Sequence, residues 1–310
     1  MDFGIIFHFG LFSVPAFDDP KLIVRRTIQN GSEWYQKRLE EKGNYRPISG
    51  WKETQKYHET HYKGKKYEDF VNDFTIDKLN IDDWMKLCKE IGATYVILTA
   101  KHHDGFCLYP TKTSKFCLKR DVIKEFVDFA RKYELKVGIY YSWYEFNQTC
   151  TKKYMDNVAT IQVNELSVYK PDIFWFDGDW ACKTKYAKET VKNICKMLKK
   201  LNPNVKINDR VCDPKNGTYR VYKDRYIPDG KEEKKEEWEH INSCGLSWGY
   251  NKAQTPKLHY KSPQTLFELY TTVKNLNGKF LLNLAPDSKG VIDVNEEKIV
   301  REFGKLIQKE

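Results

Sequence analysis

The chain has 310 residues, an ordinary length for one (β/α)-barrel, and its 40% hydrophobic residues can form a sizeable core. The formal charge is +10, but the lysines are dispersed and no nucleic-acid-binding motif accompanies them, so we expect a solvated basic surface and no nucleic-acid partner. No run of about 18 apolar residues occurs, so no membrane span is expected.

Short apolar strand-like runs alternate with Lys- and Glu-rich helical segments along the whole chain, a pattern typical of parallel βα units. The sequence enters the first such run directly after Met1-Asp2, so we expect an incomplete or trimmed N-terminus. The predicted strands are Phe3–Phe9, Tyr95–Thr99, Lys136–Tyr141, Ile173–Phe176, Val205–Asn208 and Lys279–Leu284. The predicted helices are Ile81–Ile91, Val122–Tyr133, Met155–Tyr169, Lys185–Leu201 and Pro263–Leu276.

This alternation predicts an α/β fold, a (β/α)8-like barrel of the TIM type that forms a single domain over residues 1–310. The strands are nearly continuous apolar runs, as expected for a barrel wall covered on both faces. Residues 31–74 are rich in Tyr, Trp and charge, which predicts a long loop with short helices. The charged run Lys231–Glu237 alternates in sign, so we expect an exposed loop or helix there.

The eight cysteines include no Cys-x-x-Cys pair, which argues against a structural zinc site, while their even number permits disulfides. Three Asn-x-Ser/Thr sequons, at Asn30, Asn147 and Asn216, are compatible with the secretory route. We therefore expect a secreted protein, or one in the lysosomal or endomembrane lumen.

Polar side chains follow five successive predicted strands, at the barrel end where catalytic residues gather. Each of them also has an ordinary structural interpretation. Asp177 could cap the next helix, Arg210 could form a surface ion pair, and the adjacent His102 and His103 could ligate a metal, although no carboxylate–His spacing supports a metal site. Together they indicate a sugar site, because a carboxylate flanked by Trp, Phe and Gly suits a glycosidase nucleophile.

Four motifs extend this pattern over nearly the whole chain. Phe3–Phe17 reads FGIIFHFGLFSVPAF, Thr99–Phe106 reads TAKHHDGF, Trp175–Gly178 reads aromatic-x-Asp-Gly, and Ser247–Asn251 reads SWGYN. In this order they resemble the α-L-fucosidases of glycoside hydrolase family 29. The family usually has a Trp at the position of Phe9 and a C-terminal β-sandwich after the barrel; the sequence stops at Glu310, so we expect that module to be absent.

The resemblance implies retaining hydrolysis of terminal α-L-fucose on fucosylated glycans or glycoproteins, with no metal and no organic cofactor. It implies that Asp177 is the nucleophile and that His102 and His103 bind sugar hydroxyls. The residues that match the fucose site of the family are His8, Glu33, Trp34, His102, His103, Tyr141, Trp175 and Arg210.

A retaining mechanism also needs a second carboxyl group as general acid. The family has a glutamate in the segment that matches Tyr219–Pro228, and this position falls on Lys223, with Asp224 after it. Three alternatives remain open. Asp224 supplies the proton, or Glu239 or Glu237 reaches in from the next segment, or the acid is lost and the protein is an impaired hydrolase or a fucose-binding pseudoenzyme.

Overall fold

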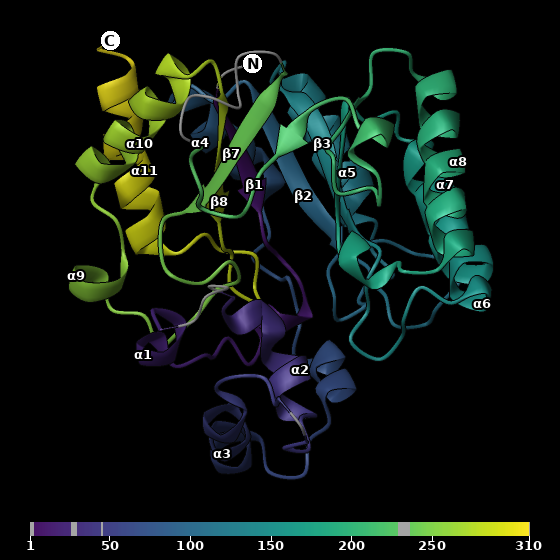
Figure 1. Ribbon diagram of the computed structural model, residues 1–310. Coiled ribbons are helices and arrows are strands. Elements are labelled where there is room, and N and C mark those ends of the chain that lie inside the picture. Colours follow the sequence, from purple (N-terminus) through teal and green to yellow (C-terminus); the bar gives the residue numbers. More distant parts are fainter. Residues whose placement is uncertain (1–2, 26–29, 45, 229–235, 310) are drawn as a thin grey trace.

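The structure is a computed structural model that describes residues 3–25, 30–44, 46–228 and 236–309. Eight parallel strands form one curled sheet (Figure 1) in the order β5-β4-β3-β2-β1-β8-β7-β6. The strands are β1 (Phe3–Phe7), β2 (Tyr95–Lys101), β3 (Lys136–Ser142), β4 (Ile173–Asp177), β5 (Lys206–Ile207), β6 (Arg220–Val221), β7 (Trp238–Ser243) and β8 (Lys279–Leu284). A parallel bridge between Asn208 and Tyr219 links the end of β5 to the start of β6. The predicted (β/α)8-like barrel is thereby confirmed.

Helices cover the outside of the barrel (Figure 1), and most of them follow a strand in the chain. They are α4 (Ile81–Glu90), α5 (Val122–Lys132), α7 (Thr160–Ser167), α8 (Lys185–Leu201), α10 (Pro263–Asn275) and α11 (Val294–Ile307). Their starts are encoded locally: Asn80 accepts a hydrogen bond from the Asp83 backbone N–H, and Thr184 accepts one from that of Ala187.

The connection between β1 and β2 extends over the carboxyl ends of the strands (Figure 1). It contains, as predicted for residues 31–74, several short helices. The helical segments of this connection and of the remaining loops are η1 (Leu11–Ser13), α1 (Pro20–Ile23), η2 (Ser32–Trp34), α2 (Tyr35–Leu39), α3 (Trp51–Tyr62), η3 (Tyr67–Asn72), α6 (Lys152–Tyr154), η4 (Met155–Ala159), η5 (Asp179–Ala181), η6 (Pro214–Asn216) and α9 (Pro256–His259).

Each of the two faces of the sheet carries its own apolar cluster. The barrel interior contains Ile6, Ile97, Tyr140, Trp175 and Leu281, among others. Neighbouring strand residues such as Tyr141, Phe174 and Phe176 belong to the larger cluster between sheet and helices. Because successive strand residues point to opposite faces, this alternation decides which strand-end side chains face the barrel axis.

The predicted elements agree with the structure where the sequence pattern is long and apolar. The Lys279–Leu284 strand and the Lys185–Leu201 helix have the predicted bounds, whereas β1 ends at Phe7 rather than Phe9. The single helix predicted at Met155–Tyr169 is a composite that begins at Lys152 and contains a π-helical turn, η4. The strands β6 and β7 and the helix α11 were not predicted.

Two of the eight cysteines, Cys150 and Cys182, form a disulfide between the loops that follow β3 and β4. No helix in the described part of the chain combines the length and the apolar character needed to span a bilayer. The charged run Lys231–Glu237 lies outside the described residues except for its last two positions.

Candidate active site

Asp177 is the last residue of β4 and points toward the barrel axis, where it is 8% exposed. Its Oδ2 accepts a hydrogen bond from the Tyr140 hydroxyl at 2.9 Å, and its Oδ1 accepts one from Arg210 at 3.0 Å. The next residue, Gly178, has a φ of +79°, and a Cβ there would lie 2.7 Å from the backbone nitrogen of Tyr144. The Asp-Gly pair therefore serves a turn that any side chain at position 178 would obstruct.

The surroundings of Asp177 keep its carboxyl ionised. Burial alone would raise its pKa, but Arg210, His103 and the Tyr140 hydroxyl outweigh that effect and hold the pKa below its ordinary value. The His103 Nε2 lies 3.7 Å from Oδ2. A buried carboxylate that stays charged is in the state that a nucleophile requires.

Arg210 connects Asp177 to a second carboxylate. One terminal nitrogen of its guanidinium contacts Asp177, and the other donates to Asp224 Oδ1. The guanidinium carbon lies 4.7 Å from the centre of the Trp175 ring, a cation–π contact. Its two carboxylate neighbours raise the pKa of Arg210 despite its burial. Asp177 and Asp224 therefore contact the two terminal nitrogens of the same guanidinium group, which brings the two carboxylates close together.

Three histidines line the same end of the barrel and have their pKa values lowered by burial, to about 4 for His103. His8 Nδ1 lies 2.5 Å from Asn283 Oδ1, and His103 Nδ1 lies 2.6 Å from Ser142 Oγ. The His102 ring stacks on Tyr140 with a centroid distance of 5.5 Å. Its buried Nδ1 has no hydrogen-bond partner within the described ranges. Neutral imidazoles can both donate and accept hydrogen bonds, which suits the recognition of hydroxyl groups.

Glu33 and Trp34 come from η2 in the β1–β2 connection. Glu33 is 1% exposed and accepts hydrogen bonds from the backbone N–H groups of Gly31, at 2.6 Å, and Gly249, at 3.0 Å. Through the bond to Gly249, Glu33 links the β1–β2 connection to the loop Ser247–Asn251, which has the sequence SWGYN. The half-buried Trp34 packs its ring edge-on against His103, with centroids 5.4 Å apart.

Tyr141 does not join this group, contrary to the assignment made from the sequence. It faces the helices, donates to Gln162 at 2.8 Å and accepts from the buried Lys101 at 3.1 Å. Tyr140, one residue earlier, faces the barrel axis and contacts Asp177. The period of two along a strand would identify Tyr140, because β3 pairs with β4 so that Tyr140 lies beside Trp175 and both face inward with Asp177.

Of the acid candidates, only Asp224 lies in the Asp177 network. Glu239 is the second residue of β7 and lies in the barrel interior, where it accepts hydrogen bonds from Tyr95 and from the Trp175 indole, each at 2.8 Å. Glu237 pairs instead with Lys206 and Lys279, both at the amino ends of their strands. Lys223 is exposed.

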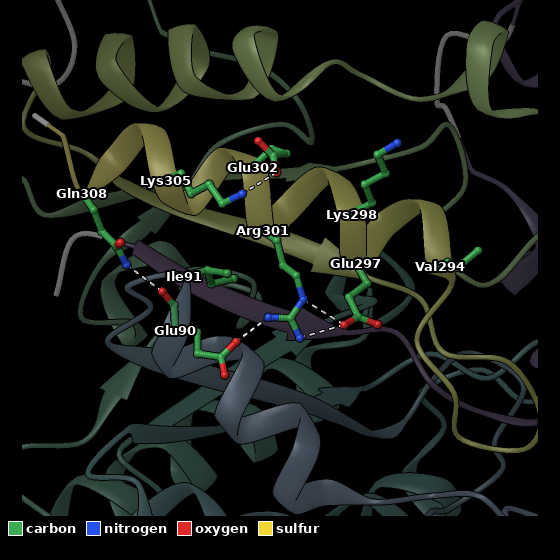
Figure 2. Close-up of a pocket in the computed structure, with 9 residues that line it drawn as sticks. All are labelled: Glu90, Ile91, Val294, Glu297, Lys298, Arg301, Glu302, Lys305 and Gln308. Atoms are coloured by element: carbon green, nitrogen blue, oxygen red, sulfur yellow. Dashed lines mark hydrogen bonds and ion pairs between the residues drawn. The ribbon is translucent and has the colours of Figure 1, made fainter.

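The groove in Figure 2 is separate from this site. It has a volume of about 530 Å³ and lies between α4 and α11 on the outside of the barrel. Its charged groups largely neutralise one another, since Arg301 pairs with Glu90 and Glu297, and Lys305 pairs with Glu302. We therefore interpret it as the seam between two helices. In the described part of the chain, no cluster of three His, Cys, Asp or Glu side chains is arranged to hold a metal ion.

Comparisons with known proteins agree on one family. The family model described as Alpha-L-fucosidase matches residues 1–310. The Alpha-L-fucosidase of Dictyostelium discoideum is 29% identical over 97% of this chain and 67% of its own length, and the Tissue alpha-L-fucosidase of Mus musculus is 30% identical over 99% and 68%. The Thermotoga maritima α-fucosidase solved in complex with fucose is 30% identical and superposes with a TM-score of 0.85, over 99% of this chain and 72% of that one. The chain spans about two thirds of the length of these relatives, and it belongs to the α-L-fucosidase family of glycoside hydrolases.

Proposed function

We propose that this protein hydrolyses terminal α-L-fucosides of glycans or glycoproteins with retention of configuration, and that Asp177 is the nucleophile. The observation that carries the proposal is the pair of hydrogen bonds from Arg210 and Tyr140 to the buried Asp177 at the carboxyl end of β4. Membership of the family and the similarity to a protein solved with fucose support the choice of sugar.

In the first step, an Asp177 oxygen attacks the anomeric carbon while the bond from that carbon to the leaving oxygen breaks. The product is a glycosyl ester of Asp177 and the released alcohol, which needs a proton. Water then attacks the anomeric carbon from the face opposite the ester bond and gives its proton to the group that protonated the alcohol. The bond from this carbon to Asp177 breaks and releases the carboxylate, so the two inversions give net retention. Neutral His8, His102 and His103 surround the site and provide hydrogen-bonding groups for the sugar hydroxyls, including the buried His102 Nδ1.

For the proton donor we propose Asp224, because Arg210 holds it close to Asp177. In that contact Asp224 Oδ1 accepts a hydrogen bond from Arg210, so the proton for the leaving group must be carried by the other carboxyl oxygen, Oδ2. This requirement, together with the exposed Lys223 at the position of the family glutamate, favours a second candidate function. In that case the protein is an impaired hydrolase or a fucose-binding protein without effective acid catalysis.

Two substrates separate these functions, because only a poor leaving group needs protonation. We expect an aryl fucoside with an acidic phenol to be cleaved, and Asp177→Asn to abolish this cleavage while fucose binding persists. If Asp224 is the acid, Asp224→Asn lowers kcat/KM for a fucosyl disaccharide by about 10²–10⁴-fold and spares kcat/KM for the aryl fucoside, whose first step needs no proton. If the acid is lost, the disaccharide is hardly cleaved by the unmodified protein, and Lys223→Glu improves its cleavage. Wild-type turnover by Asp177→Asn would refute the assigned nucleophile.

We also propose a secreted or luminal location, which the sequons and the disulfide between Cys150 and Cys182 support. Mass measurement of the protein expressed in a secretory host, with and without an N-glycosidase, tests it. Absence of glycan from all three sequons would remove that support.

A further inference from the structure

Arg210 and Tyr140, the two side chains that donate hydrogen bonds to Asp177, both pack against the ring of Trp175. The guanidinium of Arg210 lies 4.7 Å from the centre of the Trp175 ring, and the Tyr140 ring stacks on Trp175 with a centroid distance of 5.4 Å and an interplanar angle of 16°. Trp175 itself is 1% exposed and lies two residues before Asp177 on β4. A tilt of this ring would therefore move both groups that hold the Asp177 carboxylate.

The orientation of the Trp175 ring depends on Glu239. The Trp175 indole N–H donates to Glu239 Oε1 at 2.8 Å, and the Tyr95 hydroxyl donates to Oε2 at the same distance. Glu239 is 2% exposed, so water does not compete for these bonds. An indole N–H has no acceptor capacity, so it can bond only to a group that accepts.

We propose that Glu239 is a positioning residue of the active site, which as a carboxylate fixes Trp175 and thereby aligns Arg210 and Tyr140 on Asp177. The inference rests on the proposed role of Asp177 and assigns Glu239 a task other than proton donation to the leaving group. Oε1 accepts the hydrogen bond from Trp175 and Oε2 accepts the one from Tyr95, so the arrangement requires that neither oxygen carries a proton.

Protonation of Glu239 changes this arrangement. A neutral carboxyl has one hydroxyl oxygen, which must donate, and its remaining carbonyl oxygen is a weaker acceptor for the Trp175 N–H than a carboxylate oxygen. The other ionisable groups that act on Glu239 are Lys279 of β8 and Arg210, which favour its charge, and Tyr219, the residue before β6. Burial outweighs the favourable contacts and raises the pKa of Glu239 to about 7. The alignment of Asp177 should therefore weaken as the pH falls below neutrality.

The test is the pH profile of kcat/KM for an activated aryl fucoside, for which no leaving-group proton is needed. The unmodified protein should lose activity below about pH 7, as Glu239 gains its proton. Glu239→Gln keeps the shape and offers one carbonyl oxygen to the Trp175 N–H, so it mimics the neutral carboxyl at every pH. We expect Glu239→Gln to lower the plateau about tenfold and to remove the ionisation near pH 7.

Tyr95→Phe is the matched variant, since it removes the other hydrogen bond to Glu239 and leaves the bond to Trp175. The Tyr95 hydroxyl lowers the pKa of Glu239, so its loss should move the acidic limb to higher pH and leave the plateau within about twofold. The indole N–H resonance of Trp175 should titrate with the same midpoint in each folded protein and stay constant in Glu239→Gln. This readout and Tyr95→Phe keep the test decisive if Glu239→Gln does not fold.

An unchanged pH profile in a folded Glu239→Gln, or an unshifted limb in Tyr95→Phe, would overturn the inference. Asp177→Asn distinguishes this failure from that of the proposed function. If Asp177→Asn is inactive while Glu239→Gln behaves like the unmodified protein, only the role of Glu239 is wrong. If Asp177→Asn is active, the proposed nucleophile itself is wrong.

Discussion

His102 differs from its two neighbouring histidines in one respect. His8 Nδ1 and His103 Nδ1 each have a polar side chain within 2.6 Å, whereas the buried His102 Nδ1 has no partner among the residues that the structure describes. Buried polar atoms are nearly always satisfied, so each exception calls for an explanation. A sugar hydroxyl that bonds to this nitrogen provides one, and it requires no metal.

We therefore expect His102→Ala to weaken fucose binding about tenfold, the order of one neutral hydrogen bond. Calorimetric titration of fucose into Asp177→Asn, with and without His102→Ala, measures the loss in the absence of turnover. His61→Ala, in an exposed position on α3, is the control and should bind as Asp177→Asn does. If a chelator abolished binding and zinc restored it, the histidines would be metal ligands instead.

At the scale of elements, the sequence predicted best the parts whose stability is local. The strand Lys279–Leu284 and the capped helix Lys185–Leu201 have their predicted bounds, and the other predicted strands were found with different ends, because burial and capping act within the segment. The strand β6 has two residues, and β7 reads WEHINS, with four polar side chains buried by the rest of the barrel. Neither has the apolar run from which a strand is recognised.

The same limit applies to side-chain direction in the site. The strand-end motifs correctly brought Asp177, Arg210 and the histidines to one end of the barrel. The choice between Tyr140 and Tyr141 depends on pleat register, and the separation of Glu239 from the strand ends depends on where β7 starts. Both are settled by pairing with strands distant in sequence, which local patterns do not contain.

The turn after β4 provides a prediction at this scale. An alanine at position 178 must adopt a φ of +79° and place its Cβ 2.7 Å from the Tyr144 nitrogen. Strain of this kind costs about 1–3 kcal/mol, and relief of the contact would shift Asp177. We expect Gly178→Ala to lower both the melting temperature and aryl-fucoside turnover.

Gly92 offers a matched control for the conformational part of this effect. It has a φ of +86°, and a Cβ there would meet nothing within 4 Å. Gly92→Ala should therefore destabilise the protein by a similar strain and leave turnover unchanged. Equal turnover of the two variants would show that the Asp-Gly turn does not position the nucleophile.

At the scale of the whole molecule, buried histidines and buried glutamates have opposite effects on how stability depends on pH. Burial lowers the pKa of four histidines, His8, His102, His103 and His240, the last two to about 4. Burial also raises the pKa of Glu239 to about 7 and of Glu296 to about 8. A buried neutral histidine favours folding above its unfolded pKa of about 6.5, and this contribution falls as the pH drops toward the folded value.

The two glutamates act in the opposite direction. Their folded pKa values exceed the unfolded value, so their contribution is complete below about pH 4.5 and is lost as the pH rises through 7 to 8. Between pH 4.5 and 6.5 the four histidines outweigh the two glutamates, so stability rises with pH. Above pH 6.5 the histidine contribution is constant, while the carboxyl contribution still falls. We therefore expect the melting temperature to be highest near pH 6.5 and to fall toward pH 8.

Glu296→Gln tests this balance away from the active site. Glu296 is 2% exposed near the start of α11 and accepts a hydrogen bond from the Ala285 backbone N–H at 2.7 Å, which a glutamine carbonyl can also accept. The variant has no carboxyl to ionise, so its melting temperature should decline less between pH 6.5 and 8. Below pH 6.5 the histidines gain protons on unfolding, so the melting temperature of the variant should still fall as the pH decreases. A decline above pH 6.5 as steep as that of the unmodified protein would mean that Glu296 is not the group whose ionisation destabilises the barrel.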